Sequence, residues 1–365
     1  MDPPALSALS TDPRWRDLGT LLVDYSTAVQ PGERVMIAMS EVESFPLLMG
    51  VYRAVVRAGA YPQVQLLSEK LRHELLLHGS AEQLSWVPEI EAHGMEWADV
   101  YFGLRGASDL HEHDDIPADR LSLNQAAMGR ISTLRWQKTR WCLVRVPNAA
   151  LARQAGTDQR TITEMFFGAC LIDWPAHAAL WGRRAQRLGS ASRVRVLGRN
   201  TDLSFSVQGR AWIVGDGKLN LPDGELMTAP VESTVDGEIA FELPAVLGGR
   251  VVSDIRLRWE RGRLVEATAS SNQDFLRAVL ATDGGASAIG EFAMGTNPAV
   301  DRYCQDFLID EKIGGTIHIA LGRSYPGCGG VNHSAIHWDI IKDIRREGEV
   351  RVDDTTMLRG GEFLL

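Results

Sequence analysis

The sequence predicts an α/β protein with two domains: an N-terminal domain whose parallel or mixed sheet is covered by helices, and a C-terminal α+β domain that carries a metal site. The chain has 365 residues, enough for two domains of roughly 150 residues each. Its first half alternates short apolar runs with helical patterns. Its second half consists of short strand-like segments separated by glycine, asparagine and aspartate. The two different sequence patterns indicate two different domain architectures.

The first half contains four short apolar runs that we expect to be buried strands. Helical patterns separate these runs, so the order is that of βαβ units, which build parallel sheets. One such pattern, residues 43–60, reaches a glycine near its end, as helices commonly do. A longer helical region at residues 148–188 closes this half. The four expected strands are residues 33–39, 62–67, 97–104 and 140–147.

The second half begins where the alternating segment 193–210 follows the helical region. Residues 255–270 read as a β-hairpin with Glu260-Arg261-Gly262 at the turn, and a helix is expected within residues 272–290. We therefore place the boundary near residue 189. The predicted domains are an N-terminal α/β domain, residues 1–188, and a C-terminal metal-binding catalytic domain, residues 189–365.

Composition and charge exclude several classes of partner. The formal net charge is −9 and the basic residues are scattered, which argues against a nucleic-acid partner. The sequence has neither an apolar run of the ~18–20 residues that span a bilayer nor a signal-peptide pattern at its start, so no membrane association and a cytoplasmic location are expected. The four cysteines stand far apart without a CxxC pair, as expected of buried thiols.

The C-terminal half holds six side chains that suit a metal and lie near glycines. His337 and Asp339 are two residues apart, so on a strand both point to the same face. A lone histidine such as His318 is more often a satisfied core residue than a ligand. Several such groups on neighbouring strands favour a pair of divalent ions about 3.5–4 Å apart. The six candidates are Glu225, Glu291, His318, Tyr325, His337 and Asp339.

A competing cluster is the run DLHEHDD at residues 109–115. It offers two histidines and several carboxylates, but it is a charged tract with no apolar frame around it. A solvated loop is therefore the preferred interpretation, and a lid or an adventitious metal site is the alternative.

Seven segments resemble the dimeric aminopeptidase T, aminopeptidase S and PepS-type metallopeptidases, often labelled leucyl aminopeptidases. The resemblance extends over nearly the whole chain. The last five segments are the specific ones, and four of them hold the family's metal-ligand positions in the family's order. Two connecting stretches, before His318 and between Tyr325 and His337, differ in length from those of the peptidases. The segments are VQPGERVMIAMS, TRWCLVRVPNAALARQAG, NTDLSFSVQGR, NLPDGELMTAP, GEFAMGTNPAV, DEKIGGTIHIALGRSYPG and GGVNHSAIHWD.

The resemblance implies that the six candidates are the metal ligands of a metallo-aminopeptidase that removes N-terminal residues through a metal-activated water. It implies two divalent ions, for which zinc, cobalt and manganese are favoured and iron also fits. Tyr325 would ligate a metal or stabilise the oxyanion, and Glu311 would be the general base, with a plain surface salt bridge to Lys312 as the alternative. A homodimer and a peptide or small-molecule amide substrate are also implied.

Three other functions remain open at this point. The same scaffold resembles, more distantly, the 2,5-dihydroxypyridine 5,6-dioxygenases, which cleave an aromatic ring with one iron. A small-molecule amide or amine hydrolase on the same frame is a second alternative. A noncatalytic binding protein with a structural metal is the third.

Overall fold

The computed structural model describes residues 12–134 and 139–364, and these fold as two compact units. Of the described residues, the first unit contains those up to residue 171 and residues 217–222, and the second contains residues 172–216 and those from residue 223 onward. The predicted boundary at residue 189 assigns the helix α10 (Trp174–Leu188) to the first domain, whereas this helix lies in the second unit. The reason is packing: Trp181, Ala185 and Leu188 of α10 belong to the hydrophobic core of the second unit.

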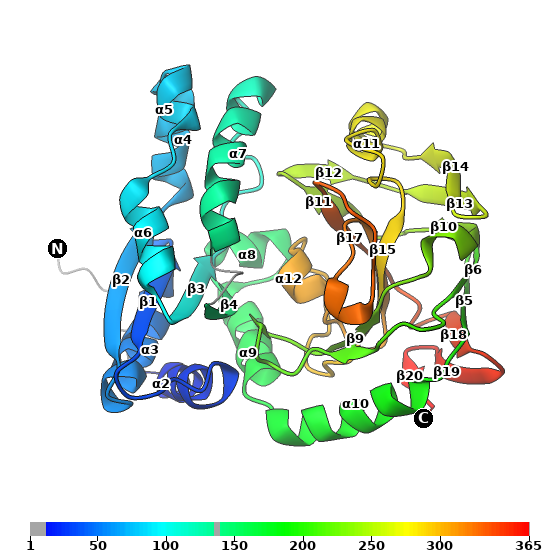
Figure 1. Ribbon diagram of the computed structural model, residues 1–365, viewed down its shortest axis with the longest axis horizontal. Coiled ribbons are helices and arrows are strands. Elements are labelled where there is room, and N and C mark those ends of the chain that lie inside the picture. Colours follow the sequence, from blue (N-terminus) through cyan, green and yellow to red (C-terminus); the bar gives the residue numbers. More distant parts are fainter. Residues whose placement is uncertain (1–11, 135–138, 365) are drawn as a thin grey trace. The chain divides into compact units, whose positions relative to one another are not determined.

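The first unit is built on a parallel five-stranded sheet in the order β2-β1-β3-β4-β8, so the predicted α/β class is confirmed (Figure 1). The inner strands are nearly continuous apolar runs because helices cover a parallel sheet on both faces. The strand β8, only two residues long, comes from the second half of the sequence and was not predicted. The strands are β1 (Arg34–Ser40), β2 (Tyr61–Leu67), β3 (Val100–Gly106), β4 (Arg140–Val146) and β8 (Asn220–Leu221).

Helices α6 and α7 cover one face of this sheet, where Met36, Tyr101 and Leu143 are buried with Met95 and Ile131. The helices of the unit are α2 (Arg14–Leu21), α3 (Phe45–Arg57), α4 (Glu69–His78), α5 (Ala81–Ser85), α6 (Glu89–Trp97), α7 (Ala118–Leu134), α8 (Ala149–Gln154) and α9 (Gln159–Cys170), with the short helical segments Leu22–Ser26 and Val42–Ser44.

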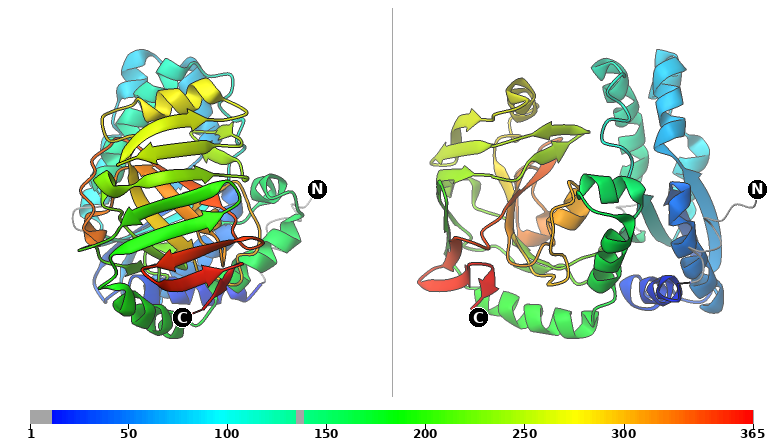
Figure 2. Two further views of the ribbon diagram at one scale, coloured as in Figure 1. Left: turned by 90° about the vertical axis from the view of Figure 1, so that its right-hand side faces the viewer. Right: turned by 180° about the vertical axis from the view of Figure 1, so that it is seen from behind.

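The second unit contains an antiparallel eight-stranded sheet in the order β14-β13-β10-β6-β5-β18-β19-β20 (Figure 2, left). Its predicted hairpin is present: β13 pairs with β14, and Arg261 (φ 48°) and Gly262 (φ 77°) form the turn. Two central residues with positive φ are typical of a two-residue hairpin. The strands are β5 (Arg193–Gly198), β6 (Thr201–Ser206), β10 (Asp236–Ala240), β13 (Arg256–Glu260), β14 (Arg263–Thr268), β18 (Gly348–Val352), β19 (Thr355–Arg359) and β20 (Glu362–Phe363).

A second antiparallel sheet in this unit, in the order β17-β16-β15-β9-β7, carries the predicted ligands. Phe292, Ile319 and Trp338 on one of its faces share the hydrophobic core with Phe205 and Leu203 of the eight-stranded sheet. The opposite face is therefore the one that can carry polar groups. The strands are β7 (Ile213–Val214), β9 (Glu225–Thr228), β15 (Ile289–Gly295), β16 (Ile317–Gly322) and β17 (His337–Lys342).

The remaining elements of the second unit are short. The strands β11 (Ala245–Leu247) and β12 (Arg250–Val252) pair as a separate hairpin, and the helices are α11 (Gln273–Leu280) and α12 (Phe307–Asp310), with the single turns Glu232–Thr234 and Pro326–Cys328. Among the described residues, no helix has both the length and the apolar character needed to cross a membrane.

Candidate metal centre

Strand register brings three of the predicted ligands into line on one face of the antiparallel sheet β17-β16-β15-β9-β7. Ala320 of β16 pairs with Glu291 of β15 on one side and with Asp339 of β17 on the other. Gly322 pairs with His337, two residues along the same strands. Residues that are directly opposite share a face, as do residues two apart along a strand. The predicted common face of His337 and Asp339 is thus confirmed, and Glu291 lies on it.

The next two rows of the same face hold the other two predicted ligands on strands. His318 of β16 is opposite Ala293 of β15, and Glu225 of β9 is opposite Gly295 of β15. The residues at the centre of the face, Ala293, Gly295 and Ala320, are all small. They leave room for the longer side chains around them to converge. We refer to Glu225, Glu291, His318, His337 and Asp339 as the ligand cluster.

A β-bulge sets the direction of Glu291. The pairing of β15 with β16 shifts between Ile289 and Glu291, so Gly290 is the extra residue. A Cβ atom at Gly290 would lie 2.3 Å from the carbonyl oxygen of Gly322, so glycine is required there. Bulges commonly re-aim a side chain beside a site.

The atoms of the ligand cluster are close enough to share cations. The Nε2 atom of His318 lies 3.3 Å from Glu225 Oε2, 3.5 Å from Glu291 Oε1 and 4.0 Å from Asp339 Oδ1. The Nε2 atom of His337 lies 3.6 Å from both Glu291 Oε2 and Asp339 Oδ1. Two triads therefore exist, Glu225–Glu291–His318 and Glu291–His337–Asp339, each with its ligand atoms within 4.8 Å of one another. Glu291 belongs to both.

Unsatisfied buried atoms test whether this cluster fits a metal. Glu225 Oε2, Glu291 Oε2, Asp339 Oδ1 and both ring nitrogens of His318 are buried without a hydrogen-bond partner among the described residues. A buried polar atom without a partner costs about 1–3 kcal/mol, and such atoms are rare in native proteins. Here the three carboxylate groups lie close to one of the two ring nitrogens, Nε2 of His318. Carboxylate and imidazole groups are ligands of zinc, manganese, cobalt and iron, so the residues fit divalent cations.

His337 is oriented for metal binding by the backbone. Its Nδ1 atom lies 2.7 Å from the carbonyl oxygen of Arg323, an acceptor, so Nδ1 carries the proton in this hydrogen bond. The Nε2 atom then presents its lone pair toward Glu291 and Asp339. Metal-binding histidines usually make such a second hydrogen bond, which fixes the ring.

The electrostatics of the cluster are those of crowded carboxylates. Burial alone would lower the pKa of His318, but Glu291, Glu225 and Asp339 outweigh it and raise the pKa to about 9. Burial raises the pKa of Glu291 despite the opposing effects of His318 and His337, and the negative charges of Glu225 and Asp339 also raise it. A bound cation reverses this balance because it favours the ionised carboxylates and the neutral imidazole.

Tyr325 lies beside the ligand cluster, at the start of the turn Pro326–Cys328. Its ring packs edge to face on His337, with 5.0 Å between the ring centroids. Burial, followed by the charges of Glu291 and Asp339, raises the pKa of its phenol well above the usual value. The phenol therefore keeps its proton in the metal-free protein and can donate a hydrogen bond.

Glu311 also reaches the cluster, following directly after α12. Its carboxylate forms a third group of potential ligand atoms with His318 and Asp339. The salt bridge to Lys312 that the sequence suggested is present at 2.8 Å, but both side chains are buried, so it is not a surface pair. Burial raises the pKa of Glu311 well above its usual value despite the opposing effect of Lys312.

Two residues of this region were not recognised as part of a site from the sequence. Lys312 is fully buried, and its Nζ atom lies 2.5 Å from Glu225 Oε1 and 3.6 Å from Asp223 Oδ1. Burial would lower the pKa of Lys312, but Glu225, Glu311 and Asp223 raise it well above the usual value. The sequence feature that could have identified Asp223 and Lys312 is their position, because each stands within two residues of a predicted site residue.

The acidic tract at residues 109–115 contributes to no group of potential metal ligands among the described residues. Its histidines are hydrogen-bonded to nearby carboxylates instead: His111 to Asp114 at 2.8 Å and His113 to Glu69 at 3.0 Å. These contacts agree with the preferred interpretation as a surface loop.

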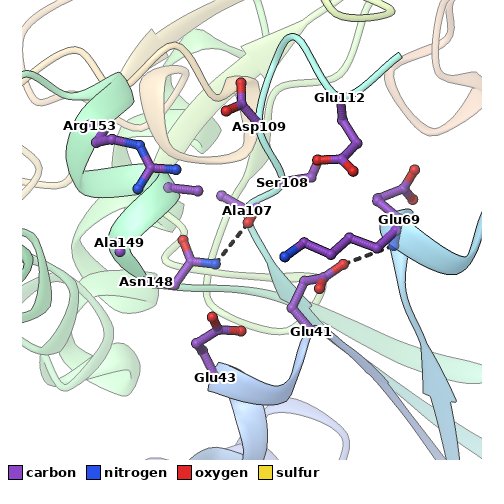
Figure 3. A pocket seen from close by; sticks show the side chains of 12 residues that line it. Glu41, Glu43, Glu69, Ala107, Ser108, Asp109, Glu112, Asn148, Ala149 and Arg153 are labelled. Carbon is purple, nitrogen blue, oxygen red and sulfur yellow. Dashed lines mark hydrogen bonds between the residues drawn. The ribbon is translucent and has the colours of Figure 1, made fainter. Parts of the chain in front are cut away.

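A pocket of about 340 Å³ lies in the first unit where β1, β3 and β4 end, as is usual for ligand sites of open parallel sheets. Figure 3 shows how its side chains are engaged: Glu41 accepts a hydrogen bond from the backbone N–H of Glu69 at 2.8 Å, and Asn148 donates to the carbonyl oxygen of Ala107 at 2.7 Å. None of the described groups of potential metal ligands lies in this pocket.

The four cysteines are buried, as predicted. Cys328 is the one nearest to the predicted site in sequence, and burial, followed by the charges of Glu291 and Glu225, raises the pKa of its thiol to about 12. A thiol that stays protonated is a poor nucleophile, so Cys328 is not a candidate for covalent catalysis.

Comparison with known proteins points in the same direction. The sequence model of a family described as thermophilic metalloprotease (M29) matches residues 11–363. Aminopeptidase T of Thermus thermophilus is 27% identical over 347 residues, covering 84% of this chain and 84% of the relative. Aminopeptidase 2 of Geobacillus stearothermophilus is 23% identical over 376 residues, covering 88% and 89%.

A solved structure, described as wild-type AmpT from Thermus thermophilus, shares the fold. Its TM-score is 0.86 at 24% identity, and the alignment covers 96% of this chain and 99% of that one. The α/β architecture, with a parallel sheet of five strands and antiparallel sheets of eight and five strands, is therefore that of a known structure.

Proposed function

This chain belongs to the thermophilic metalloprotease (M29) family and is a metal-dependent aminopeptidase, and we propose that the ligand cluster, with Tyr325 beside it, is its metal centre. The observation that supports this assignment most is the convergence of unpartnered buried atoms from Glu225, Glu291, His318 and Asp339. Buried polar atoms without partners do not stabilise a hydrophobic core. Cations held between these side chains would give partners to the carboxylate oxygens and to Nε2 of His318.

We infer two ions rather than one. Two triads of ligand atoms share Glu291, so Glu225, Glu291 and His318 would hold one ion, and Glu291, His337 and Asp339 would hold the other. The ligand types suit zinc, cobalt or manganese, and iron also fits. A divalent ion in this position lowers the pKa of a bound water and polarises a scissile carbonyl.

The chain's own residues supply the remaining chemistry. Glu311, buried beside His318 and Asp339, is the proposed general base that takes a proton from the attacking water. Tyr325 keeps its phenolic proton and would donate a hydrogen bond to the oxygen that becomes negative in the transition state. Its alternative role is that of a sixth metal ligand.

The proposed substrate is a peptide with a free N-terminus. The carboxylates of the cluster would favour an α-ammonium or α-amine over a blocked, neutral end, which confines cleavage to the first peptide bond. We extend the proposal to a homodimer, which the resemblance to dimeric peptidases implies, and to a cytoplasmic location. Light scattering behind size-exclusion chromatography tests the dimer, for which the expected mass is that of two chains.

Release of amino acids from short peptides tests the activity. Chelated protein is resupplied separately with zinc, manganese or cobalt and given matched peptides with free or acetylated N-termini. We expect metal-dependent release from the free peptides and none from the acetylated ones. Equal cleavage of both sets would contradict an aminopeptidase, and no cleavage with any metal would contradict the proposed site.

A further inference from the structure

We propose that Lys312 is a positioning residue of the metal centre: its ammonium group binds one carboxylate oxygen of Glu225 and thereby leaves the other for the metal. This inference rests on the proposed function, because it assigns a partner to one of the proposed ligands. Lys312 is not itself a proposed metal ligand, and its proposed role requires no contact with the reacting atoms. It would act through Glu225 and Glu311.

Backbone hydrogen bonds hold the segment of Lys312 in place next to the strand that carries Glu291. It follows α12, and its N–H donates to the carbonyl oxygen of Ile309 at 3.0 Å. Its own carbonyl oxygen accepts from the N–H of Asn297 at 3.2 Å, next to a parallel bridge between Asn297 and Ile313. The segment is thus attached to the chain that follows β15, the strand of Glu291.

The two oxygens of Glu225 have different surroundings. Oε1 lies 2.5 Å from the ammonium of Lys312, whereas Oε2 lies 3.3 Å from His318 Nε2 and has no hydrogen-bond partner among the described residues. A carboxylate held in this way presents one lone-pair-bearing oxygen in a fixed direction. Partners that orient a ligand in this manner commonly change metal affinity about 10- to 100-fold when they are removed.

Lys312 also contacts Glu311 Oε1 at 2.8 Å and lies 3.6 Å from Asp223 Oδ1. One ammonium therefore orients a proposed ligand and the proposed general base together. It adds a fixed positive charge to a region with five buried carboxylates, which are Asp223, Glu225, Glu291, Glu311 and Asp339. Such a charge offsets their mutual repulsion without occupying a ligand position.

A second buried lysine in the same unit provides a comparison. Lys342 donates to the carbonyl oxygen of Ala240 at 2.6 Å and to Glu242 Oε1 at 3.0 Å, and Glu242 belongs to no group of potential metal ligands among the described residues. Lys342 alternates with Asp339 and Ile341 along β17 and so points to the opposite face of the sheet. Its ammonium group therefore contacts none of the proposed metal ligands.

The test measures cobalt binding by chelated protein, through the visible absorption of bound cobalt and competition with a chelator. We expect Lys312→Met to bind cobalt about 10- to 100-fold more weakly than the wild type, with a changed spectrum. Lys342→Met is the matched control, with lower thermal stability but the wild-type cobalt affinity and spectrum. Wild-type affinity and spectrum in Lys312→Met would overturn the inference.

Loss of folding in Lys312→Met is addressed by the double variant Lys312→Met with Asp223→Asn. It removes a positive and a negative charge together, so the net charge of the buried region is unchanged. Weak cobalt binding by this folded double variant supports positioning, and wild-type binding overturns it. If the wild-type protein itself binds no cobalt, the proposed metal centre fails, which is a different result from equal binding by wild type and variants.

Discussion

The Nε2 atom of His318 lies 3.3 Å from Glu225 Oε2, although the strands that carry these residues, β16 and β9, are not neighbours in the sheet. The strand β15 runs between them, and its residues opposite His318 and Glu225 are Ala293 and Gly295. The two side chains meet above these small residues. The short distance between His318 and Glu225 therefore depends on the absence of large side chains at Ala293 and Gly295 of β15.

Enlarging Ala293 tests this relationship. We expect Ala293→Leu to separate His318 from Glu225 and to weaken metal binding at least about tenfold, with an overpacking cost of about 1–3 kcal/mol. The control is Phe292→Leu, which changes the opposite, core-facing side of the same strand. It should lower thermal stability by a similar amount and leave metal content unchanged. Normal metal content in Ala293→Leu would refute the role assigned to the small residues.

Glu291 should be the ligand on which both proposed ions depend. We expect Glu291→Gln to lose most bound metal and activity, as measured by elemental analysis and peptide cleavage. In metal-free protein the same change should stabilise the fold. The raised pKa of Glu291 means that its contribution to stability is present below the ordinary carboxyl pKa of 4.5 and is lost as the pH rises.

Thermal unfolding of chelated protein checks the second part of that prediction. At pH 8 the unfolding temperature of chelated Glu291→Gln should exceed that of the chelated wild type, and the difference should shrink as the pH falls toward 4.5. A lower unfolding temperature for the variant at pH 8 would argue against the repulsion inferred here.

Metal affinity should depend on pH through His318. The pKa of this imidazole is raised to about 9 in the metal-free protein, so a metal must displace its proton. The affinity for cobalt should rise about tenfold per pH unit up to about pH 9 and then level off. The stability contributed by the protonated imidazole is present below pH 6.5 and lost as the pH rises through about 9.

Cobalt titrations between pH 6.5 and 9.5 give the slope directly. His337→Ala is the comparison, because it removes a ligand of the other triad and leaves the proton on His318. The slope should persist in that variant at a lower affinity. A flat profile in the wild type would show that His318 carries no proton that the metal must displace.

Tyr325 should act in turnover more than in metal binding. We expect Tyr325→Phe to lower kcat by about 10²–10³-fold while metal content remains, because only the hydrogen bond to the developing oxyanion is removed. Tyr303→Phe is the control, since its hydroxyl group donates to the carbonyl oxygen of Pro244, away from the cluster. A loss of metal in Tyr325→Phe would instead identify the phenol as a ligand.

Glu311 should be required for proton transfer. Glu311→Gln keeps the shape of the side chain, and we expect turnover to fall about 10²–10⁴-fold with metal content intact. The neighbouring buried carboxylate, Asp310, accepts hydrogen bonds from the backbone N–H groups of Cys304 (2.6 Å) and Asp306 (2.8 Å). Asp310→Asn should therefore lower the unfolding free energy by about 1–3 kcal/mol. It should leave the turnover of the folded protein at the wild-type value. Unchanged turnover in Glu311→Gln would remove it from the mechanism.

The sequence alone was sufficient for the local features of this protein. Apolar runs between helical patterns indicated the parallel sheet of the first unit, because a strand buried on both faces needs apolar residues at every position. The spacing of His337 and Asp339 placed them on one face, since side chains alternate along any strand. The turn at Arg261 and Gly262 was also readable, because glycine tolerates the positive φ that such turns require.

The tertiary structure decided which of these features meet. The pairing of Glu291 with Ala320, the bulge at Gly290 and the position of β9 beside β15 depend on strand register between distant segments, which no local pattern specifies. The packing of α10 with the second unit was likewise settled by its partners, because a helix pattern shows that a face is buried without showing against what. For the same reason the burial of Lys312 among carboxylates, and with it the charge of the whole site, came from the fold.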